Sequence, residues 1–333
     1  MFTKTLLMGA AASVAIASSV AAERGSDGNV SIIYWQAPSI LNPFLSGGTK
    51  DVESASLIIE PLARYNEVGE MVPYLAAEIP TVDNGGVSAD LTSITWKIAP
   101  GIKWSDGSAF TAHDVKFTAD YCMHPEGGCA QLTKFSGVSS VEAVDDMTVK
   151  VTFENPMPFP YGPFVGGESP ILQKAQFENC MGAKAPECTA ENFGPIGTGP
   201  FVVTDFRPND VIQMVANDNY RDPAKPAFAS LTFKGGGDAT AAGRAVMETG
   251  EFDYAWNLQL APDVIARMEQ GGKGTPVAGF GPLVERIMLN QTNPSPSLDA
   301  DTRSTAAAPH PFLTDPAVTR RCQWQSTVHC WLK

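Results

Sequence analysis

The sequence predicts an α/β protein that contains an α+β insertion. Strand-like and helix-like segments alternate over much of the 333-residue chain, which favours an α/β core. The stretch near residues 80–155 is instead rich in hairpin signals, as expected of an α+β insertion. The length allows about two domains, and the chain is long enough to bury a large core.

Local patterns place the first elements. Residues 30–35 form a short apolar run, which predicts a strand. Asp51 can cap a helix over residues 51–61. Apolar and polar residues alternate over 93–99, which is typical of a half-buried strand. A capping box at 111–114 opens a further helix, because a Thr and an Asp stand three positions apart before an apolar run.

The later elements follow from the same signals. Apolar alternation predicts strands, while Gly and Pro mark the ends of helices. A Pro-rich stretch at 155–163 is typical of a rigid connector. These patterns assign strands to 138–144, 147–153, 211–216, 252–256 and 284–289, and helices to 239–249 and 262–270.

Residues 1–22 have the composition of a secretory signal peptide. Lys4 gives a positive start, residues 6–20 are apolar or small, and Val20-Ala21-Ala22 fits a cleavage site. A membrane anchor is disfavoured because the stretch is short and rich in Ala and Ser. The first cysteine is Cys122, so a lipidated N-terminal cysteine is excluded. We therefore expect the mature chain to begin near Glu23 and to be a soluble protein outside the cytoplasm that is not a lipoprotein.

The cysteines suit an oxidising compartment. Cys122 and Cys129 bracket a turn-rich segment, and so do Cys180 and Cys188. Each spacing fits a local disulfide loop, which would stabilise the fold by ~2–3 kcal/mol and carry no chemistry. Metal ligation, with His124 near the first pair, is the alternative, although metal sites usually have tighter spacing and more His.

Charge and motifs argue against several functions. A net charge of −13 provides no basic face for nucleic acid. The sequence has no nucleophile elbow, zinc-protease pair, Walker loop or dinucleotide fingerprint. None of the 4 histidines has a partner that spacing identifies. We expect no enzyme activity, no cofactor and no bound metal, and a two-domain binding protein fits the sequence better.

A series of short motifs resembles a known family. In order, these motifs are Pro73–Pro80, Thr95–Ile98, Gly101–Gly107, Phe110–Val115 and Gly197–Phe201. As an ordered set they resemble the solute-binding proteins of peptide/nickel-type ABC importers, the oligopeptide/dipeptide-binding family (bacterial solute-binding family 5). The resemblance covers about residues 28–318.

The resemblance implies a type II periplasmic-binding-protein-like fold of the large peptide-binding class. On that template the first lobe holds residues 24–55 and 156–280, the inserted subdomain 56–155, and the crossover and start of the second lobe 281–318. It also implies a monomer that captures a peptide or peptide-like solute between its lobes and delivers it to a membrane permease. Nickel or another non-peptide solute is the alternative within the family.

Candidate ligand-binding residues lie where strands of the first lobe end. Open α/β sheets bind ligands at the carboxyl ends of their strands. This rule selects Tyr34, Trp35, Gln36, Trp256, Asn257 and, at the crossover, Asn290. Aromatic rings there can pack on a peptide, and amides can bond its backbone. The alternative is that Trp35 and Trp256 are ordinary core residues, because Trp is often buried.

Residues 319–333 depart from the resemblance. The family continues after residue 318 as a helix, whereas this segment holds basic, Cys and Trp residues and no acid. One choice of codons for residues 323–333 reads Met-Ala-Ile-Asp-Arg-Ala-Leu-Leu-Val-Glu in another frame, which is the missing family pattern. We interpret 319–333 as an out-of-frame tail on a C-terminally truncated chain whose second lobe is largely missing and whose binding is impaired. A non-functional remnant is the alternative, and the downstream nucleotide sequence would decide.

Overall fold

The computed structural model describes residues 23–277, except residues 236 and 257. The chain divides into two compact units, residues 1–275 and 276–333, and every helix and strand described here lies in the first unit. Several predictions therefore fall outside the described residues. These are the signal peptide 1–22, Asn257, the crossover with Asn290, and the tail 319–333.

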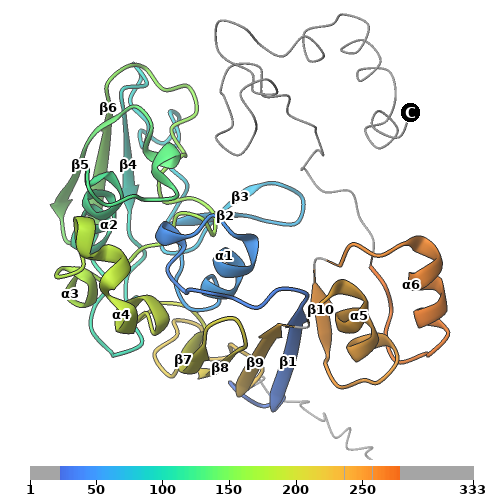
Figure 1. Cartoon of the computed structure of the whole chain (residues 1–333). Helices are drawn as coiled ribbons and strands as arrows, with labels where there is room; N and C mark the ends of the chain where they lie inside the picture. Colours follow the sequence, from blue (N-terminus) through green and yellow to red (C-terminus); the bar gives the residue numbers. More distant parts are fainter. Residues whose placement is uncertain (1–22, 236, 257, 278–333) are drawn as a thin grey trace, which may run out of the picture. The chain divides into compact units, whose positions relative to one another are not determined.

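The larger sheet has five strands in the order β10-β1-β9-β8-β7 (Figure 1). Its strands are β1 (Asn29–Tyr34), β7 (Phe201–Arg207), β8 (Val211–Ala216), β9 (Ser230–Gly235) and β10 (Tyr254–Trp256). β1 is parallel to both β9 and β10, whereas β8 is antiparallel to β7 and β9. The sheet is therefore mixed, and the carboxyl ends of its three parallel strands meet at one edge.

A helix makes the crossover between the two parallel strands that flank β1. α5 (Ala239–Met247) connects β9 to β10, and α6 (Pro262–Glu269) packs against it. The amide of Ala241 donates to the carboxylate of Asp238 at 2.7 Å and so caps the start of α5. A parallel pair needs such a connection because a tight turn cannot return the chain to the same end of the sheet.

The smaller sheet forms the α+β part of the unit. It contains β4 (Ser93–Lys97), β5 (Val138–Asp145) and β6 (Thr148–Phe153) in the antiparallel order β4-β6-β5. α2 (Ala112–Met123) packs against β5 and β6. The predicted alternation along β4 is confirmed, because Ile94 and Trp96 are fully buried.

Short elements complete the described chain. They are α1 (Thr49–Ala55), the hairpin of β2 (Ala63–Tyr65) and β3 (Met71–Pro73), α3 (Lys174–Phe177), α4 (Thr189–Phe193) and the 3₁₀ helices Pro43–Leu45, Leu132–Phe135 and Gly182–Glu187. Among the described residues, no helix combines the length and apolar character that a bilayer-spanning segment requires.

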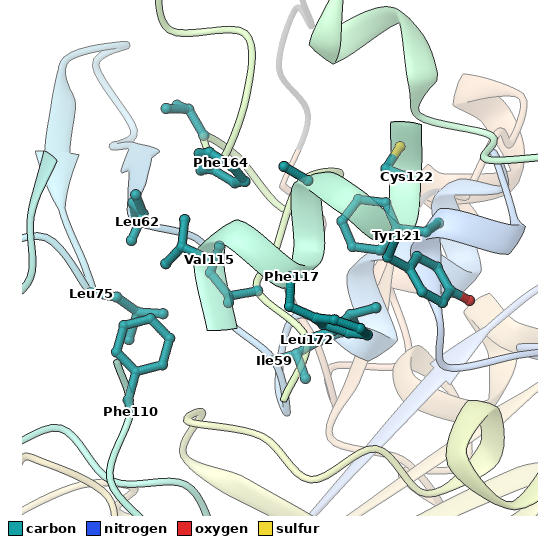
Figure 2. Packing of buried hydrophobic residues seen from close by; sticks show 14 of the residues in the cluster. Ile59, Leu62, Leu75, Phe110, Val115, Phe117, Tyr121, Cys122, Phe164 and Leu172 are labelled. Carbon is teal, nitrogen blue, oxygen red and sulfur yellow. The ribbon is translucent and has the colours of Figure 1, made fainter. Parts of the chain in front are cut away.

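One continuous cluster of buried apolar side chains extends from the larger sheet to the smaller one. It includes Tyr34 and Phe233 of the larger sheet and Val149 of the smaller. Figure 2 shows part of it: Val115, Phe117 and Tyr121 of α2 lie among Ile59, Leu62, Leu75, Phe110, Phe164 and Leu172. The larger sheet takes its strands from 29–34 and 201–256 and the smaller from 93–153. The lobe boundaries near 56 and 155 stay a prediction.

Two expectations about the elements were wrong. The helix assigned to 51–61 begins earlier, at Thr49, and ends at Ala55, with Gly48 at the N-cap position. Asp51 does not cap it, because its carboxylate accepts hydrogen bonds from the segment that precedes the helix.

β9 was not predicted, although it lies between β1 and β8. Its apolar alternation is limited to Leu231 and Phe233, which is too short to stand out locally.

Candidate ligand-binding edge of the larger sheet

The three parallel strands of the larger sheet end side by side. Tyr34, the last residue of β1, is paired with Gly235 of β9 on one side and with Trp256 of β10 on the other. The register therefore brings the predicted residues of β1 and β10 together at one edge. This is the position at which open α/β sheets bind their ligands.

The predicted aromatic residues at this edge differ in exposure. Tyr34 is 7% exposed, and its ring lies 5.3 Å from that of Trp256 in a stacked arrangement. Trp256 is half-buried, whereas Trp35 is 39% exposed and Gln36 is exposed as well. Trp35 is therefore not a core residue. Neither Asn257 nor Asn290 lies among the described residues.

The chain that leaves β1 passes close to the end of β9. A Cβ atom on Gly235 would lie only 2.4 Å from the Cβ of Ala37, so no larger residue fits at Gly235 without a shift. This close approach holds the segment that carries Trp35 and Gln36 against the edge of the sheet.

An acidic side chain from α1, Glu53, reaches the same edge. The hydroxyl of Tyr34 donates to Oε2 of Glu53 at 2.5 Å. Burial raises the pKa of Glu53, and the hydrogen bond from Tyr34 only partly opposes this. Burial, followed by the hydrogen bond to Glu53, raises the pKa of Tyr34, which therefore keeps its proton and stays a donor. Burial, followed by the charge of Glu53, also raises the pKa of Tyr254.

Glu53 was not among the residues selected from the sequence. It lies on one helical face with Thr49, Val52 and Ser56, but no spacing rule links that face to a strand 19 residues earlier. The available signal was its position in the first α-helix after β1. Only the fold brings Glu53 of α1 to Tyr34 at the end of β1.

A cavity of about 300 Å³ opens beside Glu53. Its lining combines one face of α1 with Arg64 of β2 and the loop after residue 166. The lining residues are Gly47, Thr49, Val52, Glu53, Ser56, Arg64, Gly167 and Glu168. A volume of this size is at the lower end for small-molecule sites and accommodates one residue-sized group.

Asp51 fixes the segment that connects β1 to α1. Its carboxylate accepts hydrogen bonds from the amide of Ser39 at 2.6 Å and from the hydroxyl of Ser46 at 2.7 Å. The ammonium group of Lys50 lies 3.1 Å away. Burial by itself would raise the pKa of Asp51, but these hydrogen bonds outweigh it and hold the pKa below its ordinary value. The segment after Gln36 is thereby anchored at both ends.

Other charged groups near the cavity have partners. Glu168 forms an ion pair with Lys134 at 2.5 Å. Glu60, which is 1% exposed, accepts two hydrogen bonds from the guanidinium of Arg221 at 2.5 and 3.1 Å. Arg64 donates to the carbonyl of Ser56 at 3.0 Å and lies 4.7 Å above the ring of Tyr74.

The cysteine pairs are not among the residues that line the cavity. Their Cα atoms are 5.1 Å apart for Cys122 and Cys129 and 5.9 Å apart for Cys180 and Cys188, both within the range of disulfides. In the described part of the chain, the single group of three potential metal ligands is Cys180, Cys188 and Glu191. Because the two sulfur atoms are at bonding distance from each other, this group is a poor fit for a metal site.

The described unit has the fold of the type II periplasmic binding proteins, as its similarity to solved structures shows. Sequence comparison identifies the family. The family model "Bacterial extracellular solute-binding proteins, family 5 Middle" matches residues 70–319, which is more than half of the chain. The chain belongs to this family.

The chain is also similar to individual members. It is 28% identical over 210 residues to the glutathione-binding protein GsiB of Pectobacterium atrosepticum, covering 63% of this chain and 39% of GsiB. The oligopeptide-binding protein AppA of Bacillus subtilis, solved with a nonapeptide, superposes with a TM-score of 0.60 at 24% identity over 70% of this chain and 44% of AppA. NikZ of Campylobacter jejuni, solved with Ni(L-His), superposes with a TM-score of 0.58 at 25% identity over 69% of this chain and 43% of NikZ. The chain thus spans less than half of these proteins.

Proposed function

We propose that this chain is the substrate-binding component of an ABC importer, which captures peptides or peptide-like solutes and delivers them to the membrane permease. The observation that carries the proposal is the family match over residues 70–319. The aromatic edge of the larger sheet and its adjoining cavity support it, because a peptide needs apolar surfaces for side chains and polar groups for its backbone.

In this proposal Tyr34, Trp35 and Gln36 contact the solute from β1, and Trp256 contacts it from β10. The exposed face of Trp35 offers stacking area, and the exposed Gln36 amide can bond a peptide backbone. Asn257 and Asn290 complete the proposed set. Binding uses noncovalent contacts alone, and no covalent chemistry is proposed.

The proposed location is the periplasm, with cleavage after Ala22 and disulfides at Cys122–Cys129 and Cys180–Cys188. The family's extracellular character and the spacing of the cysteine pairs support this. Intact mass of the secreted chain, with and without reductant, gives the cleavage site and the number of closed disulfides before any binding experiment.

The test is a thermal-shift screen of the secreted chain with glutathione and with pools of di- to pentapeptides. A ligand that binds only the folded state stabilises it by mass action. At a ligand concentration of a hundred times Kd the free energy of unfolding rises by about 2.7 kcal/mol, and the melting temperature rises with it. We expect at least one pool to raise the melting temperature in a concentration-dependent manner. A chain that folds cooperatively and responds to none of these solutes would contradict the proposal.

Nickel is the second candidate solute, since NikZ, with Ni(L-His) bound, is 25% identical over 69% of this chain. In the described part of the chain the donors that nickel prefers are scarce at the proposed edge, which offers Glu53 but no His. Calorimetry with NiCl₂, alone and with L-histidine, separates the two candidates. Heat of binding with nickel and none with peptides would favour nickel.

A further inference from the structure

The chain between β1 and α1 contains a buried stretch that two other parts of the fold hold in place. This connecting segment, residues 41–46, follows the residues proposed for binding and ends next to Gly47, which lines the cavity. Its first four residues are buried, and its regular structure is limited to the 3₁₀ turn Pro43–Leu45. One such turn makes few hydrogen bonds of its own, so the position of the segment depends on its neighbours.

One neighbour is the first cysteine loop, residues 122–129. The next residue, Ala130, donates its amide to the carbonyl of Phe44 at 2.8 Å. The side chain of Gln131, which is 7% exposed, donates to the carbonyl of Ser46 at 3.1 Å. The disulfide ties this end of the loop to the last turn of α2, and it thereby fixes both donors relative to that helix.

The other neighbour is the second cysteine loop, residues 180–188, together with α4, which begins directly after it. The amide of Leu41 donates to the carbonyl of Asn192 in α4 at 3.0 Å. Asn192 is 1% exposed, and its side-chain amide donates to the carbonyl of Ala185 inside the loop at 2.8 Å. The connecting segment is therefore bonded to both cysteine loops or to the residues next to them.

Asn42 joins the two sides through one fully buried side chain. Its amide group donates to the hydroxyl of Tyr121 at 3.1 Å and to Oδ1 of Asn192 at 2.8 Å, while its Oδ1 accepts from the amide of Phe44 at 3.1 Å. Both N–H donors of the amide are thus used, one toward the residue before the first loop and one toward the helix after the second. Displacement of either loop leaves a buried donor unpaired, which disfavours this position of Asn42.

The two cysteine loops also contact each other. A Cβ atom on Gly182 of the second loop would lie 2.6 Å from Cε1 of His124 in the first, so the imidazole ring lies against the Gly182 backbone. Each loop therefore supports the other, and the connecting segment depends on both.

We propose that the two disulfides together position the connecting segment, so that the cavity wall at Gly47 is ordered only in the oxidised chain. The inference rests on the proposed disulfides, and its bearing on solute capture rests on the proposed function. A dithiol that reduces one disulfide gives it two electrons and two protons, which leaves two thiols while the dithiol closes into its own disulfide. The ends of that loop can then separate, and the bonds to the connecting segment lose their fixed donors and acceptors. The chain thus acquires its binding edge after export into an oxidising compartment.

The test is hydrogen–deuterium exchange, measured by mass spectrometry on the full secreted chain without any solute. The oxidised chain is compared with two double variants, Cys122→Ala with Cys129→Ala and Cys180→Ala with Cys188→Ala. We expect each double variant to speed exchange in peptides over 41–46 by about tenfold or more, because local opening becomes easier. Peptides over β8 should keep their protection, since β8 is paired on both sides within the larger sheet. Reduction of the unmodified chain with dithiothreitol should speed exchange over 41–46 in the same way.

A milder substitution tests the link through Asn42 and leaves all cysteines in place. Tyr121→Phe removes the hydroxyl that accepts from Asn42, and it should speed exchange over 41–46 by about fivefold or more. The matched control is Tyr161→Phe, which removes a hydroxyl bonded to the carbonyl of Pro80 instead and should leave exchange over 41–46 unchanged.

Two results would overturn the inference. If either double variant exchanges over 41–46 as slowly as the oxidised chain, the two loops do not act together. If exchange over β8 rises to the same extent, the disulfides stabilise the unit as a whole rather than this segment. Neither result involves a solute, so the proposed function is decided separately by the thermal-shift screen.

Discussion

At the scale of single residues, Asp51 has a clear structural role. It is 1% exposed and accepts hydrogen bonds from Ser39 and Ser46, so it fastens the segment that follows β1 to the start of α1. The segment carries Trp35 and Gln36 at its beginning. One buried carboxylate thereby sets the path of the chain that the proposed binding site depends on.

We predict that Asp51→Asn lowers the free energy of unfolding at pH 7 by about 1–3 kcal/mol, because an amide cannot accept all of these hydrogen bonds. The folded-state pKa of Asp51 lies below its ordinary value, so its contribution is complete above about pH 4 and is lost as the pH falls through the folded-state pKa. Urea denaturation of the unmodified chain and of Asp51→Asn between pH 7 and pH 2.5 measures their free energies of unfolding. The difference between the two free energies should shrink as the pH falls.

The control for Asp51 is Asp83→Asn, which removes an exposed carboxylate without a side-chain partner among the described residues. It should change stability by less than about 0.5 kcal/mol at any pH in that range. A difference between the unmodified chain and Asp51→Asn that stays constant down to pH 2.5 would contradict the role of the ionised carboxylate.

At the scale of elements, the start of α2 is tied to two other parts of the chain. Asp114, 6% exposed, accepts from the amide of Thr111 at 3.0 Å and from the amide of Lys174 at 3.0 Å. The first bond belongs to the predicted capping box, and the second joins α2 to α3. The sequence predicted the cap, but the bond to α3 follows from packing alone.

We predict that Asp114→Ala lowers the free energy of unfolding by about 2 kcal/mol or more, because two amides lose their acceptor and one helix loses its cap. The matched control on the same helix is Asp120→Ala, which removes an exposed i,i+4 partner of Lys116 and should cost less than about 0.5 kcal/mol. Chemical denaturation followed by far-UV circular dichroism compares the two variants. If both variants lost the same free energy of unfolding, the proposed role of Asp114 in joining α2 to α3 would be contradicted.

At the scale of the whole unit, the segment Gly197–Phe201 packs against residues that are distant in sequence. The amide of Gly199 donates to the carbonyl of Ile58 at 2.7 Å, and the amide of Phe201 donates to that of Leu57. A Cβ atom on Gly197 would lie 1.8 Å from the Ile58 carbonyl oxygen. The glycines of this motif therefore allow two backbones to approach directly, which joins the start of the larger sheet's β7 to the chain after α1.

We predict that Gly197→Ala lowers the free energy of unfolding by about 3 kcal/mol or prevents folding, because the added methyl overlaps a backbone atom that cannot rotate away. Gly47→Ala is the control, since a Cβ there meets nothing within 4 Å. It should change stability by less than about 1 kcal/mol. The melting temperatures of both variants test this prediction. A Gly197→Ala variant as stable as the Gly47→Ala variant would contradict the close approach of Gly197 to the Ile58 carbonyl.

Several elements could be predicted because their signals are local. β8 has the predicted bounds, α2 begins after the predicted capping box, and the hairpin of β5 and β6 turns where two Asp residues stand together. β9 was missed because its stability comes from pairing with β1 and β8 on either side. The start of α1 was misplaced because Asp51, a good N-cap by type, uses its carboxylate for another contact.

The sequence by itself determined several of the strands and helices, the close spacing of the cysteine pairs and the ordered motifs of the family, since each depends on neighbours in the chain. It also selected the ends of β1 and β10 as candidates for binding. Only the tertiary structure decided that Tyr34 is buried while Trp35 is exposed, and that Glu53 meets Tyr34 beside a cavity. Such contacts depend on where the fold places α1 relative to the end of β1, and a pattern along the chain does not encode which distant side chains the packing brings together.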